Sequence, residues 1–429
     1  FFQGRGAQVT LSDSRTSDRI TGLESLHPLG VAFDLGHHSE ALFCSADLVV
    51  VSPGVPLSVP AVAAALAPGV PVLGEVEIAF AEFGAPLVAI TGTNGKSTTT
   101  TLMGRMFQHW GKKTFVGGNL GTPLIEAADG EGWDWGVVEL SSFQLEAIDR
   151  FHPRYALLLN LSEDHLDRYP DMDQYVAAKM RMFENMTSAD VAVLNAEDVL
   201  VREATSGIRP RQVLFSSART LEQGMGFDGS HLVWRQGGVE ERFPVGQLRL
   251  KGLHNLENVM AAMVPPLLEG CSAATVWQAA CAFAGLPHRM VEVRVLDGVA
   301  WYNDSKGTNV GSVLKSLVGL TAPVTLIAGG KDKGGDYGPW LKPVRDKVAH
   351  LILIGQAADR IEAVLGSITD TRRAATLEEA VALARELTPT GGSVLFSPGC
   401  SSFDMFSSYE ERGDLFARAV LELPQREAI

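Results

Sequence analysis

A glycine-rich loop is the feature of this sequence most able to do chemistry. Residues 85–91 are an apolar run that is typical of a buried strand, and a helical pattern starts at about residue 97. The loop between them reads Gly92-Thr93-Asn94-Gly95-Lys96-Ser97-Thr98. Glycines let backbone N–H groups approach phosphate oxygens, and a helix start adds unpaired donors. The arrangement therefore predicts a nucleotide phosphate site.

Lys96 and Ser97 are the side chains of this loop that suit a triphosphate. The ammonium group can neutralise the β- and γ-phosphate oxygens, and the hydroxyl can bind Mg²⁺. The full phosphate-loop pattern has glycine at the position of Ile90, so this loop is a shortened G-x-x-G-K-S variant. A chance Gly-Lys-Ser turn is the alternative, and the flanking strand and helix argue against it.

Polar residues also follow other predicted strands. Glu139 ends the strand predicted over 135–140, and Asp13-Ser14-Arg15 follows a short strand near 9–11. Carboxyl ends of parallel strands share one edge of a sheet, where ligands bind. We therefore expect Glu139 to reach a metal that bridges phosphates, and residues 13–15 to bind a ligand of the first domain.

The elements that position these residues alternate between short apolar strands and amphipathic helices, which predicts parallel α/β sheets. We expect three domains: residues 1–76, a Rossmann-like domain whose first strand is missing; residues 77–285, a phosphate-loop ATPase domain; and residues 286–429, a second Rossmann-like domain. Residues 214–250 alternate differently and predict a small antiparallel insert in the central domain. Residues 1–7 resemble the end of a helix.

Composition excludes several classes of protein. The chain has 429 residues, 46% of them hydrophobic, and a formal net charge of −14. A duplex DNA binder or an anionic-membrane protein needs a basic face, so we expect no nucleic-acid partner and no membrane insertion. Four scattered cysteines without metal spacing fit a reducing cytoplasm. We expect a cytoplasmic monomer.

Further motifs, in order, complete a pattern that resembles the Mur ligases, the ATP-dependent enzymes that build the peptidoglycan stem peptide. With the phosphate loop, the motifs are Gly117–Gly121, Glu139–Leu145, Asn160–Arg168, Ala178-Lys179, Gly252–Asn258, Gly285–Arg289, Asn303–Asn309 and Ser397–Asp404. The resemblance runs from about Asp13 to the C-terminus. Each motif alone is weak, and together they are specific.

The resemblance implies an ATP-dependent amide ligase that joins glutamate, most simply D-glutamate, to UDP-N-acetylmuramoyl-L-alanine through an acyl phosphate. It implies two Mg²⁺ ions, held by Ser97, Glu139, His165 and a carbamylated Lys179. Lys96, Glu139, His165 and Lys179 would be catalytic. By pattern alone, Lys179 is an ordinary solvated helix lysine.

The resemblance also assigns binding residues. Asn258 would contact adenine, and Arg289 and Asp304 would contact the phosphates and the ribose. The uridine substrate would be bound by Asp13, Ser14, Arg15, Ser52, Gly54, Asn119 and Ser141. Glutamate would be bound by Lys306, Thr308, Lys333, Ser402 and Tyr409, since lysines and hydroxyls suit two carboxylates.

Several alternatives stay open. Gly307, Gly399, Ser401 and Ser407-Ser408 depart from the usual family residues near the presumed glutamate pocket, so L-glutamate is a variant to test. A folate-type glutamate ligase would share the phosphate loop, although Ser397–Cys400 and the Asp13 region favour the muramoyl substrate. Outside this chemistry, an NTPase switch and an inert sugar-nucleotide binding module are the competing hypotheses.

Overall fold

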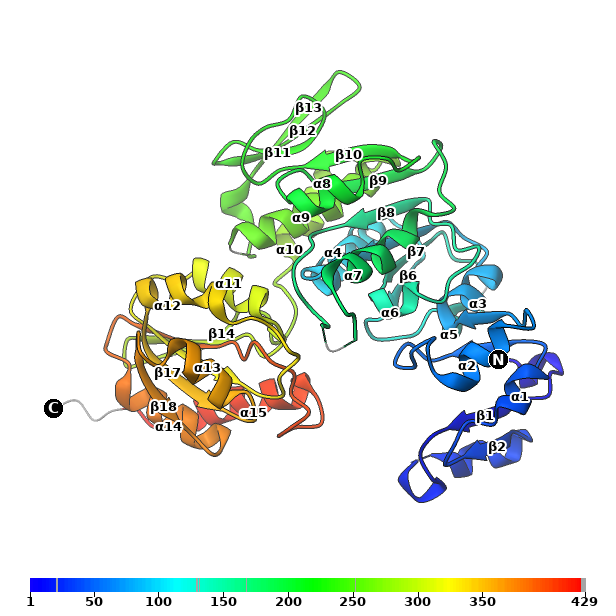
Figure 1. Cartoon of the computed structure of the whole chain (residues 1–429). Helices are drawn as coiled ribbons and strands as arrows, with labels where there is room; N and C mark the ends of the chain where they lie inside the picture. Colours follow the sequence, from blue (N-terminus) through cyan, green and yellow to red (C-terminus); the bar gives the residue numbers. More distant parts are fainter. Residues whose placement is uncertain (21, 129, 131, 167, 251, 426–429) are drawn as a thin grey trace.

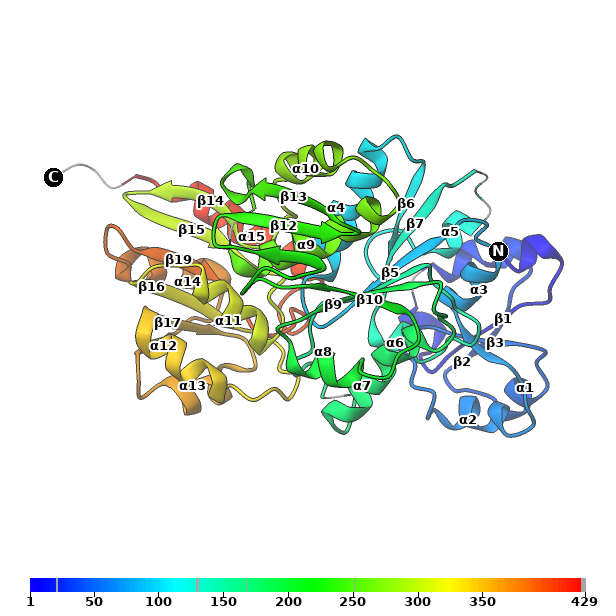
Figure 2. The ribbon, with the colours of Figure 1, turned by 90° about the horizontal axis from the view of Figure 1, so that it is seen from above.

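The structure is a computed structural model that describes residues 1–425, except residues 21, 129, 131, 167 and 251. Its strands form sheets in three successive parts of the chain. Figure 1 shows the central part between the N-terminal and C-terminal parts, and the view from above in Figure 2 agrees. The predicted three-part α/β fold is confirmed. Asp167, which lies within the Asn160–Arg168 motif, is outside the described residues.

The central sheet has nine strands in the order β13-β12-β11-β10-β9-β8-β5-β7-β6. In the parallel part of this sheet, β5 pairs with β7 on one side and with β8 on the other. The end of β5 therefore lies beside the ends of β7 and β8. The bounds of these strands are β5 Leu87–Thr91, β6 Thr114–Gly118, β7 Trp135–Glu139, β8 Tyr155–Leu158, β9 Val191–Asn195 and β10 Arg211–Phe215.

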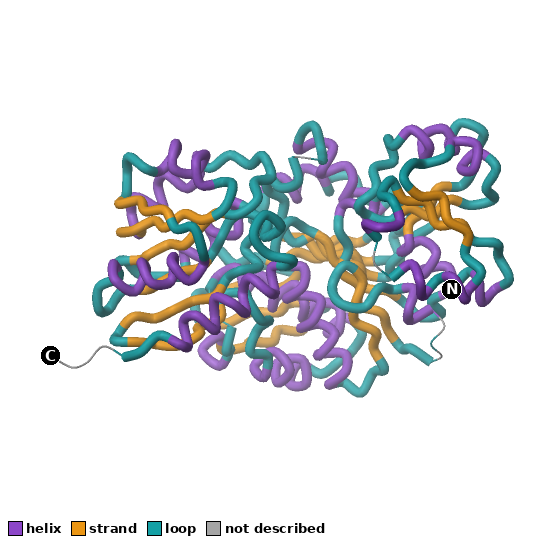
Figure 3. The backbone as a smooth tube through the Cα atoms, turned by 90° about the horizontal axis from the view of Figure 1, so that it is seen from below, coloured by secondary structure: helices purple, strands orange, loops and turns teal. Residues whose placement is uncertain are grey.

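Helices cover both faces of this sheet, which explains why its strands are apolar without alternation. On one face lie α4 (Lys96–His109), α9 (Leu253–Leu268) and α10 (Ala273–Ala282). The other face is covered by α3 (Glu75–Glu82), α5 (Ile125–Ala128), α6 (Ser142–Leu145), α7 (Met172–Met180) and α8 (Val199–Ala204). Figure 3 shows the helices packed along the strands.

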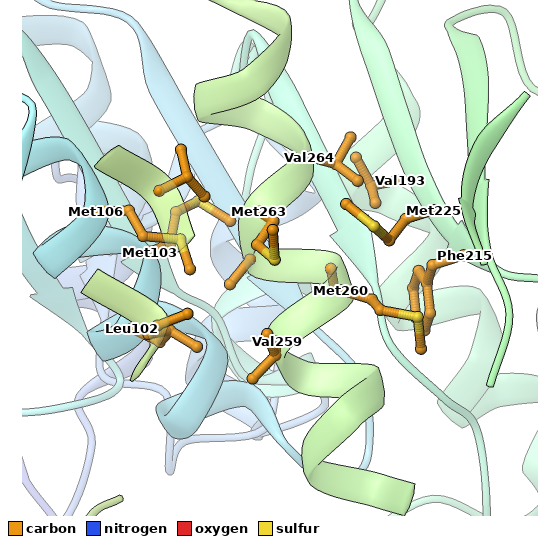
Figure 4. Close-up of a cluster of buried hydrophobic side chains, with 14 of the residues drawn as sticks. Leu102, Met103, Met106, Val193, Phe215, Met225, Val259, Met260, Met263 and Val264 are labelled. Atoms are coloured by element: carbon orange, nitrogen blue, oxygen red, sulfur yellow. The ribbon is translucent and has the colours of Figure 1, made fainter. Parts of the chain in front are cut away.

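The core beneath α4 and α9 is rich in methionine. Met263 of α9 lies on the side of Met103 and Met106 of α4, and Met260 of α9 points toward Phe215 and Met225 on the strands (Figure 4). All five methionine side chains are buried. Unbranched methionine side chains fill irregular gaps between elements. This packing fixes α9 against the helix that starts at the phosphate loop.

The predicted antiparallel insert forms, but it is not a separate sheet. Strands β11 (Gly224–Phe227), β12 (His231–Gln236) and β13 (Val239–Pro244) pair in antiparallel fashion. β11 also pairs with β10 in parallel, with Phe215 opposite Met225. The insert therefore extends the central sheet, because pairing satisfies backbone groups that the edge of β10 would otherwise expose.

The C-terminal sheet has six strands in the order β14-β15-β19-β16-β17-β18, and β14 alone of these is antiparallel. Its helices α11, α12 and α13 cover one face, and α14 and α15 cover the other. The bounds are β14 Val291–Leu296, β15 Val299–Asn303, β16 Val324–Gly329, β17 Val348–Ile354, β18 Asp370–Arg373, β19 Ser393–Phe396, α11 Val310–Val318, α12 Leu341–Lys347, α13 Ala358–Leu365, α14 Leu377–Leu387 and α15 Tyr409–Glu422.

The N-terminal part departs from a continuous Rossmann sheet. β1 (Thr10–Asp13) pairs with β2 (Ala32–Leu35), and β3 (Val49–Val51) pairs with β4 (Val72–Gly74), both in parallel. Among the described residues, no strand joins the two pairs. Helices α1 (Glu40–Cys44) and α2 (Pro60–Leu66) follow β2 and β3. The expected helix end near the N-terminus is a single 3₁₀ turn over Gln3–Arg5.

The domain boundaries near residues 76 and 285 stay predictions. Within the described ranges, every helix is too short or too polar to span a bilayer.

Candidate active site

The phosphate loop has the backbone that its sequence predicts. Thr91 ends β5, Lys96 starts α4, and Gly95 between them has φ 90°. A Cβ atom on Gly95 would lie 2.2 Å from Asn258 Oδ1, and one on Gly92 would lie 3.1 Å from the Leu159 side chain. Only glycine fits either position without displacement. The loop is therefore built for close approach of a ligand to its backbone.

Two lysines converge beneath this loop. Lys96 Nζ donates to the carbonyl oxygens of Gly92 and Thr93, at 2.8 Å each. Lys179 Nζ donates to the same Gly92 oxygen at 3.2 Å, and its side chain is fully buried. Burial lowers the pKa of Lys96, and burial together with the Lys96 charge lowers the pKa of Lys179 well below its usual value. Both predicted catalytic lysines thus lie at the phosphate site.

Glu139 lies at the end of β7, beside the phosphate-loop strand. Its Oε1 accepts from Asn119 Nδ2 at 2.8 Å, while Oε2 is buried with no hydrogen-bond partner in the described part of the chain. An unsatisfied buried carboxylate oxygen costs free energy, and a hard cation such as Mg²⁺ would satisfy it. The geometry of Glu139 therefore fits a metal ligand. Asn119, predicted as a substrate residue, orients that carboxylate.

His165 follows β8 in the left-handed conformation, with φ 58°. Its ring packs edge-on against Phe143, with centroids 4.7 Å apart. Burial lowers the pKa of His165 to about 4, although neighbouring Asp164 opposes the shift. The imidazole is therefore neutral at pH 7 and able to coordinate a cation. Over the described ranges, no cluster of three or more His, Cys, Asp or Glu forms a metal cage.

The remaining side chains of the phosphate loop either bind neighbouring segments or line a cleft beside the loop. Thr93 Oγ1 donates to Ser162 O at 3.1 Å, and the Asn94 backbone N–H donates to Asn160 Oδ1 at 2.9 Å. Thr98 lines the cleft beside the loop. Asn160 was not predicted as a site residue. It could have been found, because it is a polar residue directly after an apolar strand, like Glu139.

A cleft of about 560 Å³ opens between the phosphate loop and the C-terminal domain. Gly95 and Asn258 line it from the central domain, and Arg289, Asp304 and Lys306 line it from beyond residue 285. Arg289 Nη2 donates to Ser97 Oγ at 3.0 Å, which connects the two domains at the predicted metal and phosphate position. The structure thus brings together every residue predicted to contact the nucleotide.

Asp304 is held deep in this cleft. Its Oδ2 accepts from the hydroxyls of Ser316 and Ser397, at 2.7 Å each. Burial raises the pKa of Asp304 to about 6, and those two hydrogen bonds and Arg289 act against the rise. The carboxylate is therefore ionised at pH 7 and close to titration.

The residues predicted to bind glutamate fall into two groups. Thr308 and Lys333 line a smaller cavity together with His165, and Lys333 Nζ lies 3.4 Å from Asp164 Oδ1. Lys306 lies in the nucleotide cleft instead, with Nζ 3.6 Å from the centre of the Tyr409 ring. Burial lowers the pKa of Lys306 to about 8. Ser402 is buried, and its carbonyl accepts from Met405 N at 3.1 Å.

Arg412 was missed by sequence reasoning. Its guanidinium is fully buried and donates to Ser305 O at 2.7 Å and to the carbonyls of Cys400 and Ser401 at 3.2 Å. It therefore joins the loops that carry Lys306 and Ser402. No local sequence signal marks it, because it occupies a helix with an ordinary amphipathic pattern.

The residues predicted to bind the uridine substrate are spread out. Arg15 folds back onto Asp13, with Nη2 2.7 Å from Oδ2, and Ser14 is exposed beside them. Gly54 O accepts from Arg168 Nη1 at 3.3 Å, and Ser52 lines a small cavity nearby. Ser141 caps α6 by accepting from the backbone N–H of Gln144 at 3.2 Å. These groups do not meet in one cavity of the described residues.

Comparisons with known proteins agree with this geometry. Residues 1–74 match the family described as Mur ligase MurD-like, N-terminal domain, and residues 90–265 match the Mur ligase middle domain. The chain is 62% identical over 423 residues to a UDP-N-acetylmuramoylalanine--D-glutamate ligase of Syntrophotalea carbinolica. The match covers 99% of this chain and 94% of that protein.

Solved structures share the fold. MurF from Acinetobacter baumannii has a TM-score of 0.67 at 16% identity, covering 98% of this chain and 92% of its own. MurF from Thermotoga maritima, solved in complex with ADP, has a TM-score of 0.64 at 12% identity, covering 97% and 98%. These identities establish the fold alone. The family matches and the 62% identity confirm the resemblance carried by the motifs: this chain belongs to the Mur ligase family.

Proposed function

We propose that this protein is an ATP-dependent ligase that joins D-glutamate to UDP-N-acetylmuramoyl-L-alanine in peptidoglycan precursor synthesis. One observation carries the proposal: the C-terminal residues Arg289 and Asp304 line one cleft with the phosphate loop, and Glu139 ends the strand beside the strand that leads into that loop. The full-length relative of that name supports the choice of substrates. The enzyme acts as a monomer in the cytoplasm.

The reaction must activate a carboxylate, which is a poor electrophile. The terminal carboxylate of the muramoyl substrate attacks the γ-phosphorus of ATP, which forms an acyl phosphate and releases ADP. The glutamate amine then attacks the acyl carbon, and inorganic phosphate leaves from the tetrahedral intermediate as the amine loses its proton. Both steps bring anions together, so fixed cations must offset their repulsion.

Residues of this chain supply those cations from two domains. Lys96 lies directly under the loop that would receive the β- and γ-phosphates, and Arg289 reaches Ser97 from the C-terminal domain. Asn258 would contact adenine and Asp304 the ribose. Mg²⁺, held by Ser97, Glu139 and His165, would supply further neutralisation of the phosphates.

Lys179 is proposed to carry a carbamate. Burial and the nearby Lys96 charge lower the pKa of Lys179, which favours its unprotonated amine, and such an amine adds to CO₂ with loss of one proton. The resulting anion would suit a site that holds two Mg²⁺ ions. Mass spectrometry of the native protein should show the added mass, and full activity under CO₂ depletion would contradict the proposal.

Substrate glutamate is a small dianion, and its pocket is proposed around Lys333 and Thr308. Lys306, Ser402 and Tyr409 would border it. Lys333 Nζ donates to Asp164 Oδ1, and this contact supports the proposal that the ammonium group can bind a carboxylate. The uridine diphosphate would bind along Asp13, Ser14, Arg15, Ser52 and Gly54, with Asn119 and Ser141 on the sugar side.

Release of phosphate, measured with each substrate omitted in turn, tests the proposal. ATP, Mg²⁺ and UDP-N-acetylmuramoyl-L-alanine are supplied with D-glutamate or L-glutamate, and the peptide product is detected by mass. A ligase releases phosphate only with all substrates present, whereas an NTPase switch needs ATP alone. An inert binding module would release no phosphate. Faster turnover of L-glutamate would change the proposed stereochemistry.

A further inference from the structure

Two opposite charges face each other across the nucleotide cleft, and no motif assigns a role to either. Glu257 lies on α9 of the central domain, and Lys315 lies on α11 of the C-terminal domain. Both side chains are half-buried, and both line the cleft that contains Gly95 and Arg289. In Figure 1, α11 lies on the side of the C-terminal domain that faces α9.

One side of α11 already contacts the phosphate loop. Asn309, which caps the helix, donates to Asn94 Oδ1 at 3.4 Å, and Ser312 Oγ donates to the same oxygen at 3.0 Å. Lys315 lies three residues after Ser312, so it continues the same side by one turn. The helix is therefore anchored at its first turn, and its next turn carries a cation along the cleft.

Glu257 is fixed in place, and Lys315 is not. Ser217 Oγ donates to Glu257 Oε1 at 2.8 Å, which orients the carboxylate from the loop after β10. For Lys315 Nζ, the described residues provide no hydrogen bond and no ion pair within 4.0 Å. Burial lowers the pKa of Lys315, and Glu257 is the first of two acidic groups, with Asp198, that oppose the shift. The two charges attract but do not touch.

Other groups around the pair favour its closure. His254 is half-buried near Lys315 and Arg289, and partial burial followed by those two cations lowers the pKa of its imidazole to about 4. His254 is thus neutral and does not repel Lys315 further. A bound triphosphate would add negative charge between Arg289 and Lys96 and would draw the C-terminal domain toward the central domain.

We propose that Glu257 and Lys315 form an interdomain latch, an ion pair that closes over bound nucleotide and retains it. The inference rests on the proposed nucleotide-dependent function. A small movement of α11 about its anchor at Asn94 would bring the ammonium and carboxylate into contact. Because both groups are half-buried, their attraction is screened less than that of a surface pair. The latch would act on nucleotide retention and not on the chemical step.

Charge reversal tests the latch. The dissociation constant of a non-hydrolysable ATP analogue with Mg²⁺ is measured for the full chain, for Glu257→Lys, for Lys315→Glu and for the double exchange. Each single reversal should weaken binding about fivefold, and the double exchange should return it to within about twofold of the native value, since the ion pair is restored in reverse. Glu257→Gln and Lys315→Met provide a second, neutral pair of variants.

Steady-state kinetics distinguish a latch from a purely structural role of the two residues. The KM for ATP should rise in the single variants, while kcat and the KM for glutamate stay near the native values. Glu203→Lys and Lys342→Glu, on exposed positions of α8 and α12, are matched controls that should leave the ATP affinity unchanged. Raising the salt concentration should weaken nucleotide binding more in the native protein than in the Glu257→Gln, Lys315→Met double variant.

The latch is wrong if substitutions at Glu257 and at Lys315 change nucleotide binding independently of each other. If Lys315→Met weakens binding equally with Glu257 or Gln at position 257, then Lys315 contacts phosphate directly and no latch exists. Coupling of Lys315 to Asp198→Asn instead of to Glu257 would equally refute it. Native ligation is measured in parallel: absent coupling in an active ligase refutes the latch alone, whereas a native protein that binds no nucleotide refutes the proposed function as well.

Discussion

The phosphate loop and the Asp13–Arg15 loop both follow parallel strands, yet they present their polar groups in opposite ways. At the phosphate loop, Lys179 is fully buried, and Lys96 donates to two backbone carbonyls. At the other loop, Arg15 is exposed and bonds Asp13 through its backbone N–H, Nε and Nη2. Buried backbone and side-chain contacts hold the polar groups of the phosphate loop in place. At the other loop, Arg15 and Asp13 are held by each other.

Under the proposed function, this difference would separate the residues that catalyse from the residues that bind the uridine substrate. Groups that stabilise developing charge are effective when they are fixed before the ligand arrives and are shielded from water. Groups on an exposed loop must be reoriented by the ligand, and that ordering costs part of the binding free energy. We therefore expect substitutions in the central cleft to lower the rate, and substitutions near residue 15 to change only affinity.

Replacing Lys96 should have the largest effect. Lys96→Met removes the cation beneath the loop that is proposed to bind the β- and γ-phosphates, and kcat should fall about a thousandfold, as for loss of one preorganised charge-stabilising group. Phosphate release in the complete ligation mixture measures it. Lys342→Met, on an exposed part of α12, is the control for loss of one positive charge. A fall in kcat of fivefold or less would show that the Lys96 charge does not stabilise the transition state.

Gly95→Ala should have the next largest effect. The new Cβ atom would overlap Asn258 Oδ1, and φ 90° is unfavourable for alanine. We expect kcat/KM for ATP to fall about a hundredfold, because both the loop and the proposed adenine contact must move. Gly111→Ala is the matched control: its φ is 84°, but no atom lies near its Cβ position. Equal ATP effects in the two variants would mean that strain, and not the Asn258 contact, matters.

Asp304→Asn should weaken ATP binding and stabilise the folded protein, and the gain in stability should depend on pH. The pKa of Asp304 in the folded chain is raised to about 6, above the usual 3.8. The folded state therefore binds this proton more tightly, and the stability it contributes is full below pH 3.8 and lost as pH rises through 6. Relative to the native protein, the variant should gain about 1–3 kcal/mol between pH 4 and pH 8.

Urea unfolding at pH 4.5, 6 and 8 measures this gain, with Asp346→Asn on an exposed position of α12 as control. The KM for ATP should rise about tenfold in Asp304→Asn, because the proposed charge-assisted hydrogen bond to the ribose would be lost. A stability difference that does not change with pH would contradict the raised pKa.

Local signals were enough to predict the central region. The short apolar run before residue 92, followed by a glycine-rich loop, favours a strand with both faces buried, and Val88 and Ile90 indeed pack in one core while Leu87 and Ala89 pack in the other. The glycines and the helix start then define the loop without reference to the rest of the chain. Burial of Lys179 was not visible in its helical pattern, which is that of a solvated lysine, and only the family resemblance indicated a role for this residue as a carbamate.

Contacts between distant segments could not be predicted. The spacing of residues 214–250 indicates antiparallel strands, but not that Phe215 pairs with Met225 to join them to the central sheet. Similarly, nothing local places Lys333 beside Asp164 or Arg412 among the carbonyls of two loops. Such contacts depend on how domains and loops pack, and a side chain's own neighbours in sequence carry no information about them.

The exposed N-terminal loop gives the smallest expected effect and the sharpest test of the contrast. Arg15 lowers the pKa of Asp13 to about 2, through hydrogen bonds first, so the pair is fully charged throughout the working pH range. Arg15→Ala and Asp13→Asn should each raise the KM for the uridine substrate about threefold to fivefold, since exposed charge pairs contribute little. The KM for ATP, kcat and the melting temperature should not change.

Ser25→Ala, elsewhere in the N-terminal part, is the control for these two substitutions, because its hydroxyl donates to Gly22 O within an exposed turn. If either substitution at residue 13 or 15 lowered kcat as strongly as a change in the phosphate loop, the exposed pair would be taking part in charge stabilisation. The separation between a fixed catalytic region and a ligand-ordered recruitment region would then be wrong. An effect confined to the uridine KM would instead support binding of the uridine substrate at the end of β1, where the proposed function puts it.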